Sequence, residues 1–255
     1  MKLSDLKVIV TGGASGMGRC FSLELARGGA AVMVADLDQA KMDEVVAAGR
    51  ELPGKIVARK ANVADEADVA ALINAAHDEL GGLNGLVNNA GIFRDGLLVK
   101  KDKESGAIKR MSLDQWNAVI AVDLTGPFLC TREFAAKMIE TGTPQSCIVN
   151  ISSVSRHGNQ GQSNYSAAKA GLVADTKLWS QELARYGVRV GAIAPGFVDT
   201  PILQGMRPDV LEGMLKGVPL RRAGKPEEIF AAVKFIFECD YFTGRCVDVD
   251  GGLSM

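Results

Sequence analysis

Short apolar runs alternate with longer stretches of helical periodicity from one end of the chain to the other. Apolar runs without interleaved polar residues are typical of strands that helices bury on both faces. The predicted strands are Lys7–Val10, Ala31–Asp36, Ile56–Lys60, Gly85–Asn88, Cys147–Ile151, Arg189–Ala194 and Cys246–Val249. The predicted helices are Gly16–Arg27, Gln39–Glu51, Glu66–Leu80, Leu113–Ile139, Asn164–Tyr186 and Glu227–Phe237. A strand–helix–strand succession requires right-handed crossovers, which place the strands parallel in one sheet.

The sequence therefore predicts an α/β fold of the Rossmann type, a doubly wound parallel sheet of about seven strands with helices on both faces. A chain of 255 residues can form one large domain or two small ones. Because no linker or internal repeat divides it, we expect residues 1–255 to form a single domain. Two segments fall outside the alternation. Val99–Arg110 is an expected charged loop or hairpin, and the methionines in Thr200–Gly224 suit a substrate lid or ordinary helix packing equally well.

Composition excludes several classes of function. The formal net charge of -1 provides no general basic field for nucleic acid or an anionic membrane. No apolar run approaches the roughly 20 residues that span a bilayer. The five cysteines are scattered and form no C-x-x-C pair, which favours reduced thiols in the cytoplasm over disulfides or a metal site. We expect no nucleic-acid, membrane or metal partner.

A glycine-rich turn, Thr11-Gly-Gly-Ala-Ser-Gly-Met-Gly18, follows the first predicted strand and opens a helix. Glycines at 12, 16 and 18 lack a Cβ, so a pyrophosphate can approach the backbone and the helix N-terminus, where free N–H groups favour an anion. The spacing differs from G-x-G-x-x-G, and a plain strand-to-helix turn is the alternative.

Asp36 ends the second predicted strand, where a carboxylate can accept hydrogen bonds from adenosine ribose hydroxyls. The same carboxylate repels a 2′-phosphate, and neither Ser15 nor Leu37 offers a compensating cation. We therefore expect NAD(H) in preference to NADP(H), although Arg19 keeps NADP(H) open. The alternative is that Asp36 only caps a turn.

Tyr165 and Lys169 lie one helical turn apart on one face of a predicted helix. A nearby ammonium lowers the pKa of a phenol from its usual value near ~10, which allows proton exchange with an alcohol or alkoxide. Such pairs also arise by chance on helix surfaces. Ser153 follows the predicted strand Cys147–Ile151, where its hydroxyl can stabilise a developing oxyanion. No acid or base is placed to make it a nucleophile.

In this order the motifs resemble those of the short-chain dehydrogenase/reductase family over essentially the whole chain. The resemblance rests on Thr11-Gly12-x-x-x-Gly16-x-Gly18, Asn88-Asn-Ala-Gly91, the set Ser153, Tyr165 and Lys169, Pro195-Gly196 with Thr200, and Val249-Asp-Gly-Gly252. It implies that Tyr165 transfers the proton, Ser153 binds the substrate oxygen, and Lys169 lowers the pKa of Tyr165 and binds the nicotinamide ribose. It also implies a homotetramer or dimer.

The resulting site is as follows. The expected catalytic residues are Ser153, Tyr165, Lys169 and Asp123. The expected cofactor-binding residues are Gly12, Ser15, Gly16, Met17, Gly18, Asp36, Asn62, Val63, Asn89, Ala90, Gly91, Tyr165, Lys169, Pro195, Gly196, Val198 and Thr200.

Three positions depart from the family pattern. Asp123 stands where the family usually has Asn, whose role there is to hold a water that links the lysine to solvent, so the proton relay is in doubt. Asn62 stands where an Asp often contacts adenine, and its amide can make that contact. The segment from Ser153 to Tyr165 is one residue shorter than in most relatives, which makes Ser152 a rival for the serine role.

The segments around Tyr165 and Thr200 resemble 3-oxoacyl-carrier-protein reductases, whereas the Val99–Arg110 insertion resembles relatives that oxidise 3-hydroxyacyl-coenzyme A. Its five basic residues outnumber two acidic ones, so it can hold a coenzyme A phosphate or an acidic carrier protein, or be a solvated hairpin. We expect an NAD(H)-dependent oxidoreductase for a 3-oxoacyl or 3-hydroxyacyl thioester. The alternatives are a dehydrogenase of small or aromatic secondary alcohols and a dinucleotide sensor without turnover.

Overall fold

A seven-stranded parallel sheet forms the centre of the computed structural model, which describes residues 1–205 and 207–253. Its strands are β1 (Lys7–Thr11), β2 (Ala31–Asp36), β3 (Lys55–Lys60), β4 (Gly85–Asn88), β7 (Ser146–Ile151), β8 (Val188–Pro195) and β9 (Cys246–Val249). Their order is β3-β2-β1-β4-β7-β8-β9, and every neighbouring pair is parallel. The predicted doubly wound sheet is confirmed. The strand order reverses between β1 and β4, where such sheets bind ligands.

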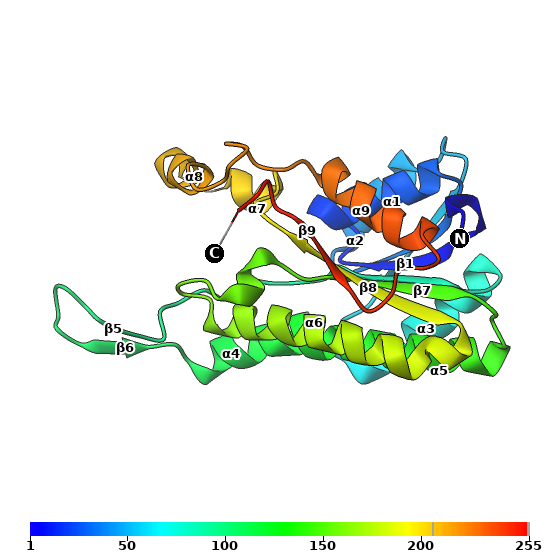
Figure 1. Ribbon diagram of the computed structural model, residues 1–255, viewed down its shortest axis with the longest axis horizontal. Coiled ribbons are helices and arrows are strands. Elements are labelled where there is room, and N and C mark those ends of the chain that lie inside the picture. The colour runs from blue at the N-terminus through cyan, green and yellow to red at the C-terminus, as the bar shows by residue number, and fades with distance from the viewer. Residues whose placement is uncertain (206, 254–255) are drawn as a thin grey trace.

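Helices cover both faces of the sheet (Figure 1). On one face lie α1 (Gly16–Arg27), α2 (Gln39–Ala48) and α9 (Pro226–Glu238), and on the other lie α3 (Glu66–Leu80), α5 (Gly126–Thr141) and α6 (Ser163–Leu183). Successive strand residues point to opposite faces, which divides the core in two. In β1, for example, Val8 packs against the first layer and Ile9 against the second.

The predicted helix Leu113–Ile139 is interrupted. It consists of α4 (Leu113–Ile120), one π-helical turn (Ala121–Thr125) and α5. Pro127 has no N–H to donate to the carbonyl of Asp123 four residues earlier, which interrupts α-helical bonding at this point. Single π-turns of this kind often occur at functional sites. The predicted capping box of Ser112 and Gln115 does start α4.

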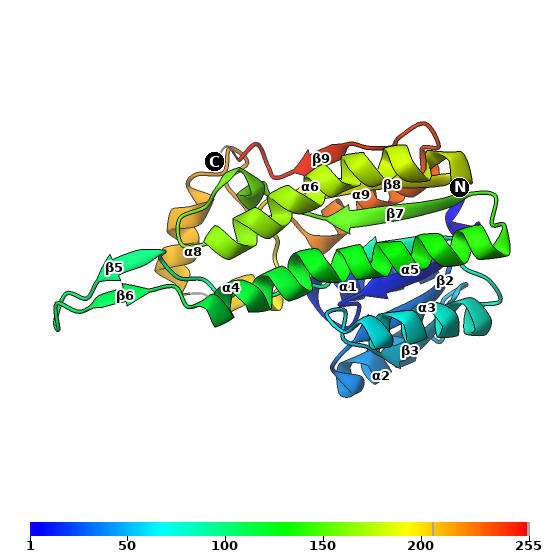
Figure 2. The same cartoon turned by 90° about the horizontal axis from the view of Figure 1, so that it is seen from below.

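The insertion forms an antiparallel hairpin of β5 (Val99–Lys101) and β6 (Ile108–Arg110). Both views show it projecting from the body of the molecule (Figures 1 and 2). All six strand residues are exposed. In Thr200–Gly224, α7 (Pro201–Gln204) and α8 (Pro208–Leu215) lie at the same end of the molecule as the hairpin (Figure 1).

Three single-turn 3-10 helices complete the described secondary structure: Leu3–Asp5, Val154–His157 and Ala184–Tyr186. Within residues 1–205 and 207–253, no helix combines the length and the apolar character needed to cross a membrane. The methionine at position 206 belongs to the predicted lid and lies outside the described residues.

Candidate active site

The glycine-rich turn after β1 is closely packed and has no space for side chains at two of its glycines. A Cβ on Gly18 would lie 2.0 Å from the carbonyl oxygen of Gly12. Gly12 itself has φ +60°, and its Cβ would lie 2.9 Å from the Cα of Ala90. Ser15 precedes α1 but makes no side-chain cap, so it does not occupy the first N–H groups of the helix. An anion can therefore bind at this N-terminus.

The loop after β4 holds this turn in place. The Asn89 amide donates to the carbonyl oxygens of Thr11 (3.0 Å) and Gly12 (3.1 Å). In return, the Thr11 hydroxyl accepts the backbone N–H groups of Asn89 (3.0 Å) and Ala90 (3.1 Å). Asn89 and Ala90, expected to bind cofactor, thus organise the turn from behind.

Asp36 lies at the end of β2, directly across the turn. One carboxylate oxygen accepts the Ala14 N–H at 3.1 Å, and the other accepts the Leu37 N–H at 2.7 Å. Asp36 therefore stabilises the turn, as the capping alternative requires. Asp36 Oδ1 also accepts the Asp38 N–H at 3.3 Å, whereas Oδ2 has further acceptor capacity; because the residue is partly exposed, a ribose hydroxyl can bind there as well.

The next two expected cofactor residues differ in exposure. Asn62 follows β3 and is partly exposed; its side-chain oxygen accepts the Ala64 N–H at 3.1 Å, which leaves its amide hydrogens as donors. The Val63 side chain is buried against Gly126, because a Cβ on Gly126 would lie 2.9 Å from Val63 Cγ2. Only the backbone of Val63 can therefore contact a ligand.

The segment after β8 lies against the chain after β9 and approaches the glycine-rich turn. A Cβ on Gly196 would lie 2.7 Å from the Cα of Asp250, so the segment from Pro195 to Gly196 runs directly against the chain after β9. Val198 is buried and bridges to Gly224. A Cβ on Gly16 would lie 3.7 Å from Thr200, which brings this segment to the glycine-rich turn.

Tyr165, Lys169 and Asp123 form a buried cluster at the same edge of the sheet. Lys169 Nζ lies 3.2 Å from Asp123 Oδ2, donates to the carbonyl oxygen of Ile151 at 3.0 Å, and lies 5.4 Å from the centre of the Tyr165 ring. The other carboxylate oxygen of Asp123 accepts the Ile92 N–H at 2.9 Å. Asp123 has no exposed surface, and Lys169 is 3% exposed. The π-turn directs Asp123 toward this cluster, which helical periodicity does not predict.

The two candidate serines lie in different surroundings. Ser152 is 3% exposed, and its hydroxyl donates to the Lys169 carbonyl oxygen at 2.9 Å. The Ser153 hydroxyl accepts the Ser155 N–H at 3.1 Å, and it is close enough to the Tyr165 phenol to lower the pKa of that group. Ser153, and not Ser152, is therefore available to a substrate oxygen at Tyr165.

Burial and charge act together on the ionisable groups of the cluster. Burial raises the pKa of Tyr165, the Lys169 charge lowers it and Asp123 raises it, with a net shift upward. Burial lowers the pKa of Lys169, but Asp123 and Tyr165 raise it by more, so Lys169 stays protonated. The resemblance implied a net lowering for Tyr165. Asp123, which stands where the resemblance predicts an Asn, opposes that effect.

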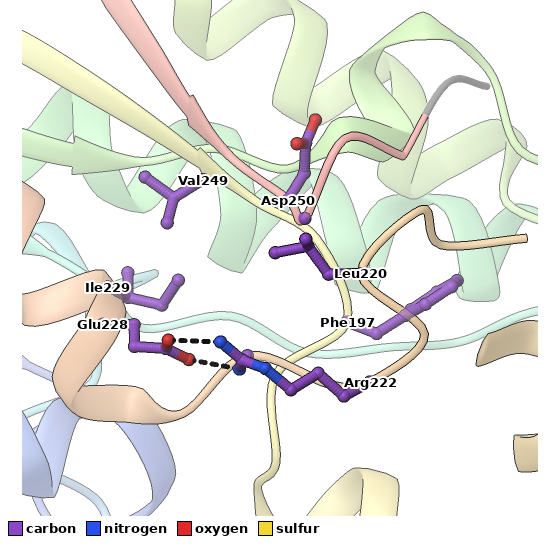
Figure 3. Close-up of a pocket in the computed structure, with 9 residues that line it drawn as sticks. Phe197, Leu220, Arg222, Glu228, Ile229, Val249 and Asp250 are labelled. Atoms are coloured by element: carbon purple, nitrogen blue, oxygen red, sulfur yellow. Dashed lines mark hydrogen bonds and ion pairs between the residues drawn. The ribbon is translucent and has the colours of Figure 1, made fainter.

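A pocket of about 100 Å³ lies where the segment after β8 meets α9 and the end of β9 (Figure 3). Arg222 points into it and pairs with both carboxylate oxygens of Glu228 at 2.7 Å. Phe197 and Leu220 line the same pocket, and Ser153, Tyr165 and Lys169 do not. This pocket is therefore separate from the expected catalytic side chains.

Known proteins match the chain over nearly its whole length. The family model described as "Enoyl-(Acyl carrier protein) reductase" matches residues 12–254. The chain is 39% identical over 256 residues to the 3-oxoacyl-(acyl-carrier-protein) reductase FabG of Thermotoga maritima, and the match covers 99% of each protein. It is 37% identical over 266 residues to the (3R)-3-hydroxyacyl-CoA dehydrogenase of Canis lupus familiaris, covering 100% of this chain and 98% of that protein.

Among solved structures, the crystal structure of a levodione reductase superposes with a TM-score of 0.84 at 32% sequence identity, covering 96% of each chain. The similarity therefore extends over nearly the complete chain and is not limited to the glycine-rich turn.

Proposed function

The chain belongs to the short-chain dehydrogenase/reductase family, oxidoreductases that act on CH–OH donors with a nicotinamide cofactor, and on that premise we propose that it interconverts a 3-oxoacyl and a 3-hydroxyacyl thioester with NAD(H). One observation carries the proposal: the Ser153 hydroxyl and the Lys169 ammonium both act on the Tyr165 phenol at the carboxyl edge of the sheet, with Lys169 Nζ 5.4 Å from the centre of the Tyr165 ring. This arrangement places a proton donor beside a second group that can bind the same oxygen.

The backbone of the glycine-rich turn and of the α1 N-terminus suits a dinucleotide cofactor. The uncapped N-terminus of α1 suits the pyrophosphate, and the glycines at 12 and 18 leave no side chain in its way. Bound there, the nicotinamide supplies or accepts the hydride. The carboxylate of Asp36 supports NAD(H) over NADP(H), because it would repel a 2′-phosphate. Thr200 and the Pro195–Gly196 backbone are proposed to hold the carboxamide.

The chain's own residues handle the substrate oxygen and its proton. Ser153 donates a hydrogen bond to the carbonyl oxygen and stabilises the charge that develops on it. During reduction the O–H bond of Tyr165 breaks and a new O–H bond forms on the substrate oxygen; during oxidation the proton moves back. Lys169 holds the cofactor ribose and stabilises the phenolate.

The names of the relatives support a thioester substrate. Both curated relatives act on 3-oxo- or 3-hydroxyacyl groups, one on an acyl carrier protein and the other on coenzyme A. The solved levodione reductase keeps a small ketone as the alternative substrate class. A sensor without turnover has no use for a phenol, a hydroxyl and an ammonium gathered at one point.

Surface features support the expected partners. The hairpin carries Lys100, Lys101, Lys103 and Arg110 in addition to Lys109, which pairs with Asp102. These cations are proposed to bind an acidic carrier protein or a coenzyme A phosphate. Exposed apolar side chains lie on α4, α5 and α6: Leu113, Trp116, Phe128, Ile139 and Leu178. They support assembly into a homotetramer. The five unpaired cysteines support a cytoplasmic location.

The deciding experiment supplies NADH with acetoacetyl-coenzyme A, acetophenone or crotonyl-coenzyme A and follows the loss of NADH absorbance. We expect kcat/KM to be highest for acetoacetyl-coenzyme A. Crotonyl-coenzyme A, which has a C=C bond and no ketone at carbon 3, is the control for enoyl reduction. Faster turnover of acetophenone would favour the small-ketone alternative, and cofactor binding without any turnover across a broad ketone panel would favour the sensor.

A further inference from the structure

The buried carboxylate of Asp123 is the feature of the site that the family mechanism does not require. It lies in the π-turn between α4 and α5, with one oxygen 3.2 Å from Lys169 Nζ and the other accepting the Ile92 N–H. The loop after β4 is built around it, because a Cβ on Gly91 would lie 2.7 Å from Asp123 Oδ2. The backbone of Gly91 and Ile92 therefore packs closely around the Asp123 carboxylate.

The positive charge of Lys169 is consequently paired with the carboxylate of Asp123. Its ammonium lies between a carboxylate oxygen and the Ile151 carbonyl oxygen, and it is nearly inaccessible to water. Opposite charges this close in a poorly solvated environment largely cancel in their effect on a third group nearby. The Tyr165 ring is such a group, since its centre is 5.4 Å from Lys169 Nζ.

The charged and polar groups that act on the Tyr165 phenol come from several elements. Lys169 lies on the same helix, Asp123 on the π-turn, and Ser153 after β7. The loop after β4 contributes Asp95 and the Phe93 ring, whose centre is 4.6 Å from that of Tyr165. One cation therefore faces two carboxylates. Burial and both carboxylates raise the pKa of Tyr165 against the lowering by Lys169.

We propose that Asp123 is a positioning residue that offsets the Lys169 charge, so that the Tyr165 phenol keeps its proton at neutral pH and the site acts mainly as a proton donor for carbonyl reduction. This inference rests on the proposed function only for the identity of the reaction. Reduction consumes the phenolic proton, whereas oxidation requires the phenolate as proton acceptor. An Asn at this position would leave the Lys169 charge uncompensated and favour the phenolate.

The test is an absorbance titration of the tyrosines in the cofactor-free protein, for wild type and Asp123→Asn. Subtracting the same titration of Tyr165→Phe isolates Tyr165 from Tyr186 and Tyr241. We expect Tyr165 in Asp123→Asn to lose its proton at a pH lower by at least about one unit, the size of shift that a nearby charge produces. An unchanged or higher titration midpoint overturns the proposal.

Asp95→Asn is the matched control, because it removes the same charge from an exposed side chain. Water screens this charge, so its shift should be clearly smaller. If the two variants shift the phenol equally, the buried pair has no special role. If Asp123→Asn does not fold by circular dichroism, Asp123→Ser replaces it and is expected to shift the midpoint in the same direction.

Kinetics provide a second readout. In Asp123→Asn the alkaline fall of kcat/KM for reduction and the acidic fall for oxidation should both move to lower pH. At its own optimum the variant should keep at least about a tenth of wild-type activity, because the groups that touch the substrate remain. A purely structural role predicts a lower melting temperature with unmoved pH profiles. The titration needs no substrate, so failure of the thioester proposal would leave this test intact.

Discussion

Replacing Ser152 or Ser153 by alanine separates the catalytic hydroxyl from a structural one. Each change removes one hydrogen bond: Ser152 loses its bond to the Lys169 carbonyl oxygen, and Ser153 loses the one it accepts from the Ser155 N–H. A typical bond of this kind contributes about 0.5–1.5 kcal/mol to stability. For a domain of this size that lowers the melting temperature by roughly 1–6 °C. Both variants should therefore be destabilised to a similar, small extent.

Their activities should differ much more. Ser153 lies beside the Tyr165 phenol and can donate to the developing oxyanion, and loss of such a donor costs about 10²–10³ in kcat, or ~3–4 kcal/mol. Ser152 is buried and faces the backbone of α6, so Ser152→Ala should stay within about tenfold of wild type. The assay is NADH-dependent reduction with a thermal melt of each variant. An inactive Ser152→Ala beside an active Ser153→Ala would refute the assignment.

Three further predictions concern the cofactor turn, the ribose site and the hairpin. Gly18→Ala places a Cβ 2.0 Å from a backbone oxygen, so NADH binding, measured by fluorescence, should weaken at least about tenfold; Gly213→Ala, which meets nothing within 4 Å, should leave binding unchanged. Asp36→Ala should raise the NADPH-to-NADH affinity ratio at least about tenfold, and an unchanged ratio would leave this residue only its turn-capping role. Neutralising Lys100, Lys101 and Lys103 should raise KM for acetoacetyl-coenzyme A but not for a small ketone. If the variant and the wild type have the same KM for the thioester, the hairpin lysines are excluded as a binding site.

The fold could be predicted from the sequence because a sheet that is buried on both faces requires strands with continuous apolar runs. Strands such as Val8–Val10 are apolar at every position, since both neighbouring layers need apolar contacts. The glycine-rich turn was equally predictable, because only glycine tolerates the backbone approach at positions 12 and 18. These are local requirements, and they need no knowledge of distant residues.

The details of the site depend on contacts between distant segments and could not be predicted in this way. The π-turn at Asp123 carries one local signal, Pro127, but the pairing of Asp123 with Lys169 depends on how the π-turn packs against α6. The choice between Ser152 and Ser153 depends on which hydroxyl is bound by the backbone of α6 after the chain leaves β7, and that hydroxyl belongs to Ser152. The hydrogen bonds from the Asn89 amide to the backbone of the glycine-rich turn likewise join two segments that are distant in the sequence.

The most direct test of the whole account is the Tyr165→Phe variant. It removes a single hydroxyl from a side chain that is 8% exposed and keeps the ring that packs against Phe93. We predict that kcat falls at least about 10²-fold, the contribution of a positioned proton donor, while NADH still binds. Turnover within tenfold of wild type, with the cofactor bound normally, would contradict the assignment of Tyr165 as the proton donor.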